Sequence, residues 1–221
     1  MNTIPLLLAS NSPRRRQLLA LGGWLFDVAV SNSDESILPN EAPEAYVRRL
    51  AEVKARTVLA QARPEQIIIG SDTSVVVDGE ILGKPADADE AHRMLRRLRG
   101  RSHQVYTGIA ILRAADEALL TDVCITDVPM RDYSDEEIAA YVASGDPLDK
   151  AGAYGIQHPH FQPVASMDGC YASVMGLPLC HLTVLLRRMD VAPPANVAAN
   201  CQATLHYQCP IFASILDEKN K

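Results

Sequence analysis

Apolar and polar positions follow two distinct periods over residues 1–190 of this chain. Short apolar runs, several of them rich in β-branched residues, predict strands over residues 6–9, 26–30, 67–77, 80–82, 105–112 and 119–128. Apolar residues at helical spacing, with capping residues near the ends, predict helices over residues 13–21, 44–62, 87–98 and 135–145, and a last helix that follows residues 176–179 and ends near residue 189. Strict strand–helix–strand alternation is absent from this order. We therefore expect an α/β fold with a mixed β-sheet flanked by helices, not a Rossmann fold or a barrel.

Two segments lack this periodicity. Residues 150–176 are rich in Gly, His and Pro, and we expect a loop with brief strands there. After Asp190 the composition changes to prolines, alanines and asparagines with scattered apolar residues. We interpret residues 1–190 as one domain and residues 191–221 as a C-terminal appendage of uncertain order, weakly ordered or loosely docked. Its removal is expected to change stability little.

Composition and charge narrow the classes of function. A hydrophobic content of 48%, a charged content of 22% and a mean hydropathy of −0.02 are typical of a soluble globular protein. The net charge of −6 argues against broad nucleic-acid binding, which needs a basic face. The chain shows no apolar window of membrane-spanning length and no signal-peptide pattern at its start. Five cysteines without regular spacing indicate reduced thiols, so we expect a cytoplasmic protein with no nucleic-acid or membrane partner.

A basic cluster at the start of the first predicted helix is one candidate site. Ser12 is a suitable N-cap residue, Pro13 suits the first helical position, and residues 14–16 are all arginines. Free backbone N–H groups and the helix dipole would then lie beside guanidinium groups, an arrangement that binds anions such as phosphate. A solvated helix start with basic residues explains the pattern equally well.

Asp72 is the strongest single candidate for a functional residue, because it places a carboxylate in a strand that is otherwise apolar and buried. Ionised carboxylates are rarely buried without a partner or a metal, which favours a functional role. The alternative is an aspartate that closes a turn by bonding backbone N–H groups. Glu35, in the loop after the second predicted strand, is a weaker candidate as its partner.

Two lysines and a glycine-rich string are further candidates. Lys84 lies in the string of residues 79–85, which resembles a phosphate-binding P-loop only superficially, because Pro85 replaces the required Ser or Thr. Lys54 would by default be a surface residue on the polar side of its helix. In the string of residues 149–157, glycines allow close approach of a ligand, and Gln157 could bind the polar edge of a base. An ordinary glycine-rich loop is the alternative.

Two groups of metal-binding residue types are weaker candidates. One group is Cys201, His206 and Cys209, whose spacing is irregular and which lacks an obvious fourth ligand. The other is the string of residues 158–160, which we interpret as a loop. Neither pattern predicts a metal site.

Six short strings, taken together, resemble the Maf family. They occur in the family's order over residues 5–188 and are Ala9–Arg15, Gly70–Thr73, Leu82–Pro85, His103–Gly108, Asp149–Gln157 and Gly176–Leu179. The resemblance implies a fold related to the inosine triphosphate pyrophosphatases. It also implies hydrolysis of nucleoside triphosphates to a nucleoside monophosphate and pyrophosphate, with a divalent metal cation, Mg²⁺ or Mn²⁺. The string at residues 149–157 resembles the branch of the family that acts on dTTP and UTP.

The resemblance further implies roles for single residues. Asp72 matches the family's proton acceptor, and the family's specificity positions are matched by Arg14, Thr73 and Gln157. We expect the phosphate chain to be bound by Ser10, Arg15, Lys54 and Lys84. We expect the metal to be held by Glu35 and Asp72, since Mg²⁺ favours a few carboxylates and several waters. The sequence does not separate activation of water by Asp72 from metal binding by Asp72.

Two other functions stay open at this point. The chain could be a nucleotide-binding regulator of cell division without turnover, or a pyrophosphatase for 7-methyl-GTP. Asp72 favours catalysis, because a binding protein does not need an acidic group next to phosphates. The sequence departs from the family at His158, where the family usually has Gly, so the rim of the pocket is not defined by the resemblance. A nucleoside triphosphate is the expected partner, and a homodimer remains an option.

Overall fold

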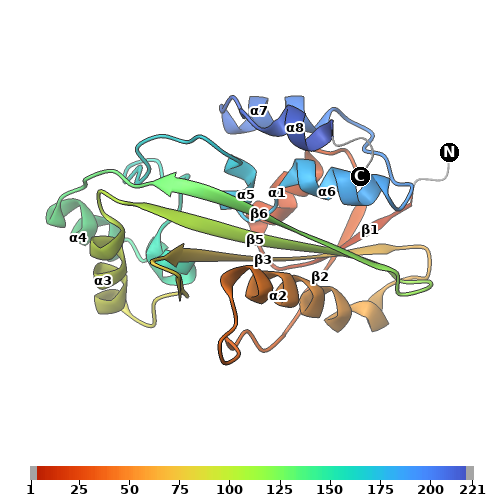
Figure 1. Cartoon of the computed structure of the whole chain (residues 1–221), viewed down its shortest axis with the longest axis horizontal. Coiled ribbons are helices and arrows are strands. Elements are labelled where there is room, and N and C mark those ends of the chain that lie inside the picture. The colour runs from red at the N-terminus through yellow and green to blue at the C-terminus, as the bar shows by residue number, and fades with distance from the viewer. Residues whose placement is uncertain (1–3, 218–221) are drawn as a thin grey trace.

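The computed structural model describes residues 4–217, and one six-stranded β-sheet lies at its centre (Figure 1). The strands are β1 (Leu6–Ala9), β2 (Phe26–Ala29), β3 (Ile67–Val77), β4 (Glu80–Leu82), β5 (Ser102–Arg113) and β6 (Leu119–Pro129). They are ordered β2-β1-β3-β5-β6, with β4 also paired to β3. β1 is parallel to β2 and β3, whereas β3 is antiparallel to β4 and β5, and β5 is antiparallel to β6. The expected mixed sheet is confirmed.

Helices lie on both faces of the sheet and beyond one end of it (Figure 1). In residues 4–217 they are α1 (Pro13–Ala20), α2 (Pro43–Thr57), α3 (Ala88–Leu98), α4 (Asp135–Ala143), α5 (Tyr171–Val174), α6 (Leu179–Arg187), α7 (Val197–Leu205) and α8 (Phe212–Leu216). Short 3-10 helices are η1 (Leu59–Gln61), η2 (Asp146–Asp149) and η3 (Ala151–Ala153). α2 covers one face, α1, α5 and α6 lie on the other, and α3 and α4 pack together at one end.

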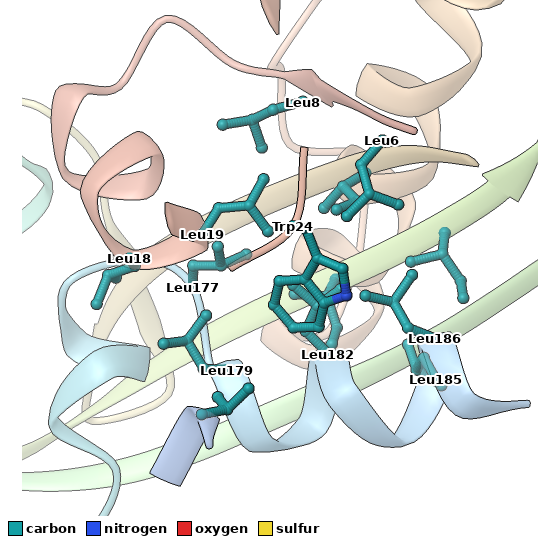
Figure 2. Close-up of a cluster of buried hydrophobic side chains, with 14 of the residues drawn as sticks. Leu6, Leu8, Leu18, Leu19, Trp24, Leu177, Leu179, Leu182, Leu185 and Leu186 are labelled. Atoms are coloured by element: carbon teal, nitrogen blue, oxygen red, sulfur yellow. The ribbon is translucent and has the colours of Figure 1, made fainter. Parts of the chain in front are cut away.

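The largest hydrophobic core lies between the sheet and helices α1 and α6 (Figure 2). Leu6 and Leu8 of β1 face the buried Leu18 and Leu19 of α1. α6 contributes leucines at helical spacing, namely Leu179, Leu182, Leu185 and Leu186. This burial anchors α1 against the sheet, and the first turn of α1 is thereby held at the carboxyl end of β1.

Helix α2 lies very close to the opposite face of the sheet. Gly70 of β3 and Gly108 of β5 face its backbone. A Cβ on Gly70 would overlap the carbonyl oxygen of Ala51, and a Cβ on Gly108 would overlap that of Val47. Two glycines at these positions therefore let the helix approach the strands. This approach places the buried side chains of α2 directly over the middle of β3.

The structure differs from the sequence-based expectations in two internal segments. The expected helix over residues 44–62 ends at Thr57 and continues only as the short helix η1. Residues 150–176 hold the short helices η3 and α5, and their pairing with the sheet region is a single bridge between Met130 and Val164. The expected brief strands are therefore wrong, because the segment satisfies its backbone groups through turns and side chains.

Residues 191–217 of the C-terminal segment fold into helices that pack on the body of the protein, so the expected loose docking is wrong for these residues. Asn196 caps α7 by accepting a hydrogen bond from the Ala199 amide (3.0 Å). Val191 and Val197 join the largest core, which also packs against Cys201 and Leu205 of α7. The spacing of residues 197, 201 and 205 gives α7 one apolar face. Removal of residues 191–217 would expose that part of the core. The division into domains at residue 190 stays a prediction.

None of the helices within residues 4–217 has the length and hydropathy needed to span a lipid bilayer. The same residues contain no group of three or more His, Cys, Asp or Glu side chains arranged to hold a metal ion.

Candidate active site

A cavity of about 210 Å³ lies where the start of α1, the middle of β3 and the string of residues 149–156 converge. It opens beside a wider groove that shares several of its walls. The charged and polar residues that line the cavity are Ser12, Arg14, Arg15, Glu35, Lys54, Asp72, Thr73, Lys84, Asp149 and Lys150. Its apolar wall is made by Val75, Val105, Tyr154, Ile156, Val174 and Met175. Ser10 lines the adjoining groove.

Lys54 joins two carboxylates at the floor of the cavity. Its Nζ lies 2.6 Å from Asp72 Oδ1 and 2.8 Å from Glu35 Oε1. Lys54 and Asp72 are only 8% and 6% exposed, whereas the Glu35 side chain is half exposed. Partial burial raises the pKa of Glu35, but the hydrogen bond and charge of Lys54 outweigh this and hold the pKa below its usual value. The three groups form a charged cluster that is open to a ligand on the Glu35 side.

The default expectation of a surface position for Lys54 is wrong. The buried face of α2 consists of Tyr46, Val47, Leu50, Ala51, Lys54 and Ala55. Lys54 therefore interrupts an apolar stripe at helical spacing, much as Asp72 interrupts an apolar strand. This signal was present in the sequence, because a lysine in such a stripe needs a buried partner.

Arg15 is held by three groups, two of which come from distant parts of the chain. Its Nε donates to the Gly176 carbonyl (2.9 Å), Nη2 to Thr73 Oγ1 (3.3 Å) and Nη1 to Ser10 Oγ (3.4 Å). Burial lowers the pKa of Arg15, and the charges of Asp72 and Glu35 oppose that shift. Arginine stays protonated in proteins, so a fixed positive charge faces the cavity.

Arg14 and Lys84 complete the positive side of the site. Both line the cavity, and within residues 4–217 neither side chain makes a hydrogen bond or an ion pair. Ser12 caps α1 by accepting from the Arg15 amide (3.4 Å), so the start of the helix also faces this region. Two unpaired cations and a helix start together form an anion-binding surface.

Thr73 lies between Arg15 and β5. Besides accepting from Arg15, its Oγ1 is 3.0 Å from the hydroxyl of Thr107, which also reaches the Ser173 carbonyl (2.8 Å). The orientation of Thr73 is therefore set directly by Arg15 and Thr107, and Thr107 is in turn held by Ser173. Its hydroxyl is a polar point at the boundary between the charged and apolar walls.

The loop over residues 149–157 contributes Lys150, which the sequence analysis did not single out. Lys150 Nζ lies 2.9 Å from Asp146 Oδ1 and 2.6 Å from Asp149 Oδ1, and its side chain is largely buried. Its place in the glycine-rich string was the available signal. Gln157, in contrast, is exposed and does not line the cavity. The structure thus brings together the predicted site residues except Gln157, with Ser10 in the adjoining groove.

His158, the departure from the family pattern, packs outside the cavity at the rim. Its Nδ1 accepts a hydrogen bond from the Phe161 amide (3.0 Å), and its ring lies 4.6 Å from that of Tyr141. The Tyr141 hydroxyl in turn donates to Asp146 Oδ2 (2.6 Å) and accepts from the Gly155 amide (2.9 Å). The side chain of His158 therefore supports the rim.

Comparisons with known proteins agree with the resemblance. Residues 5–189 match the model of the family described as Maf-like protein. A dTTP/UTP pyrophosphatase of Salinibacter ruber is 50% identical over 185 residues, 83% of this chain and 90% of its own. A dTTP/UTP pyrophosphatase of Hahella chejuensis is 46% identical over 189 residues, 84% of this chain and 92% of its own. The solved structure of the Staphylococcus aureus Ham1 protein shares 16% identity at a TM-score of 0.43, covering 72% of this chain and 88% of that one. The protein described here belongs to the Maf family.

Proposed function

We propose that this protein hydrolyses nucleoside triphosphates to a nucleoside monophosphate and pyrophosphate, with dTTP and UTP as the preferred substrates. The observation that carries the proposal is the buried Lys54–Asp72 pair beside Glu35, facing two unpaired cations in one cavity. The names of the relatives from Salinibacter ruber and Hahella chejuensis support the same chemistry and the same substrates.

The positive side of the cavity suits a triphosphate. Such a ligand carries about four negative charges near neutral pH, and charge develops on the leaving pyrophosphate during cleavage. Arg14 and Lys84 have no partner in residues 4–217 and can turn toward that charge. Arg15 is fixed by three hydrogen bonds, so it offers its remaining N–H groups without reorganisation.

Asp72 is suited to accept a proton from the attacking water. Lys54 binds its Oδ1, and Oδ2 has no hydrogen bond to any group within residues 4–217. The ion pair fixes the carboxylate in one orientation, which a general base requires. Glu35, bound to the same Nζ but half exposed, faces the phosphate side.

Glu35 and Asp72 also fit a divalent cation. Each has one oxygen on Lys54 and a second oxygen without a protein partner in residues 4–217, and two carboxylates plus substrate phosphates are a usual donor set for Mg²⁺. When bound, Mg²⁺ or Mn²⁺ would neutralise phosphate charge and polarise the bond that breaks. Lys54 would then keep the two carboxylates oriented toward the phosphate chain.

The apolar wall is the proposed site of the base. Tyr154 and Ile156 offer flat and aliphatic surfaces, and Thr73 and Arg14 supply polar groups at the edge. Hydrogen bonding to polar groups of the base discriminates between substrates more strongly than apolar fit. Gln157 can join this recognition only for a base that extends past Ile156 to the mouth of the cavity. A cytoplasmic location, indicated by five free cysteines, completes the proposal.

The purified protein should be incubated with dTTP, UTP, the other common nucleoside triphosphates and 7-methyl-GTP, each with Mg²⁺ or Mn²⁺. Pyrophosphate and phosphate are then measured separately. We expect pyrophosphate without phosphate, fastest from dTTP and UTP. Release of phosphate alone would contradict the cleavage position, a preference for 7-methyl-GTP would contradict the substrate assignment, and binding without turnover would identify a regulator instead.

A further inference from the structure

The C-terminal segment, residues 191–217, lies beyond the family match and makes specific contacts with the elements that carry the site. The Ala195 amide donates to the Gly22 carbonyl (3.2 Å), and Asn200 Nδ2 donates to the Leu21 carbonyl (2.9 Å). Both acceptors follow the last turn of α1, whose first turn carries the site arginines. Helices α7 and α8 pack on α6, on the same face of the sheet as α1 and α5 (Figure 1).

Tyr207 connects this segment to Gly169, which precedes the residues that form part of the cavity wall. His206 ends α7 in the left-handed conformation (φ 50°), which turns the chain back toward the body of the protein. The Tyr207 hydroxyl then donates to the Gly169 carbonyl (3.0 Å) and accepts from the Gly169 amide (3.2 Å). Gly169 is buried, and one phenol bonds both of its backbone groups. The Cys209 thiol also donates to the carbonyl, at 3.9 Å.

Gly169 begins a short segment that ends at the cavity. The next residue, Cys170, caps α5 by accepting from the Ser173 amide (3.3 Å), and residues 174–176 line the cavity. The Gly176 carbonyl accepts the Nε hydrogen bond of Arg15. The segment 169–176 therefore has Tyr207 at one end and the Arg15 guanidinium at the other.

We propose that Tyr207 is a positioning residue, which fixes Gly169 and through the segment 169–176 holds the Gly176 carbonyl and Arg15 in place for the phosphate chain. This inference rests on the proposed function, since it takes Arg15 as a phosphate-binding residue. Loss of the phenol hydroxyl leaves the buried Gly169 amide unpaired and its carbonyl with only the weak Cys209 thiol as a donor, so the segment shifts to satisfy them. A purely structural cover would instead affect stability and leave nucleotide affinity unchanged.

The test compares Tyr207→Phe with Tyr133→Phe. Tyr133 is buried in the second core, donates to the Leu95 carbonyl (2.8 Å) and does not line the cavity, so its variant loses a comparable hydrogen bond elsewhere. With dTTP and Mg²⁺, we expect Tyr207→Phe to raise KM about 3- to 10-fold, because a displaced Arg15 binds the phosphate chain less firmly. Tyr133→Phe should lower the Tm and leave KM at the wild-type value. An unchanged KM in Tyr207→Phe would overturn the inference.

Amide hydrogen exchange separates this inference from the proposed function. Residues 170–176 should exchange faster in Tyr207→Phe than in the wild type or in Tyr133→Phe. If the wild type released no pyrophosphate from any nucleoside triphosphate, the proposed function would fail. The positioning role of Tyr207 would then be tested by amide hydrogen exchange and by the binding of inorganic tripolyphosphate. Faster exchange with weaker tripolyphosphate binding in Tyr207→Phe would support it, and wild-type exchange would overturn it.

Discussion

The two ends of the cavity are built in different ways. At the charged end, α1, α2 and β3 provide Arg15, Lys54 and Asp72, and each side chain is held by at least one hydrogen bond to another element. At the other end, the rim is a loop, and Gln157 is exposed with no hydrogen bond in residues 4–217. A group on a packed element is positioned more accurately than one on a loop. On the proposed assignment of roles, the phosphate chain would be bound by groups on packed elements, whereas Gln157 at the rim is free to adapt to the base.

The largest effect is expected from Asp72→Asn, at the charged end. The change keeps the shape of the side chain but removes the proposed proton acceptor, so pyrophosphate release from dTTP should fall by about 10²- to 10⁴-fold. Circular dichroism should show an intact fold. Wild-type turnover in this variant would remove Asp72 from the mechanism.

Lys54→Met tests whether the charged end is held together by its buried ion pair. The variant leaves Asp72 buried without its cation, which should cost about 3–5 kcal/mol in the free energy of unfolding. The double variant Lys54→Met/Asp72→Asn should recover part of that loss, because no unpaired charge remains. Urea unfolding of the two single variants and the double variant measures this coupling, and strictly additive losses would contradict it.

Low pH should destabilise the protein through His103, which lies behind the apolar wall of the cavity. Its Nε2 lies 2.8 Å from the hydroxyl of Tyr154, which lines the apolar wall, and burial lowers the pKa of His103 to about 4 from 6.5. Between pH 6.5 and pH 4 the unfolded chain binds a proton at His103 that the folded protein excludes. The contribution of His103 to the free energy of unfolding therefore keeps its full value above pH 6.5 and decreases as the pH falls toward 4. At pH 5 the loss is about 2 kcal/mol. The free energy of unfolding should be measured by urea denaturation at pH 7 and pH 5. Its decrease between these pH values should be smaller in His103→Asn than in the wild type by about the same 2 kcal/mol.

The smallest effect is expected from Gln157→Ala, at the rim. In the proposed role, an exposed side chain would make only a weak contact with the base, so the preference for dTTP and UTP over purine nucleotides should decrease by about 1 kcal/mol, roughly fivefold in kcat/KM. Lys84→Ala is the matched comparison, since it should slow all nucleoside triphosphates alike. Equal slowing of every nucleotide by Gln157→Ala would show that the loop does not read the base.

Local patterns in the sequence were sufficient for most of the regular elements. The apolar run of β3, the turn at Asp78 and Gly79, and the capping box at Ser134 each depend on residues close together in the chain. The family motifs likewise predicted which residues should form the site. The predictions of the regular elements succeed because strand period, turn chemistry and helix capping are short-range properties, whereas the roles of the site residues stay a prediction.

Tertiary structure decided how those residues meet. Lys54 reaches Asp72 because Gly70 and Gly108 admit α2 close to the sheet, and Arg15 is oriented by Gly176, which lies far along the chain. The tail docks because the apolar face of α7 finds a complementary core, which its composition alone did not indicate. The sequence by itself therefore determined the elements and the chemical groups of this protein. Burial, partner choice and the position of Gln157 depend on long-range packing, which no local pattern encodes.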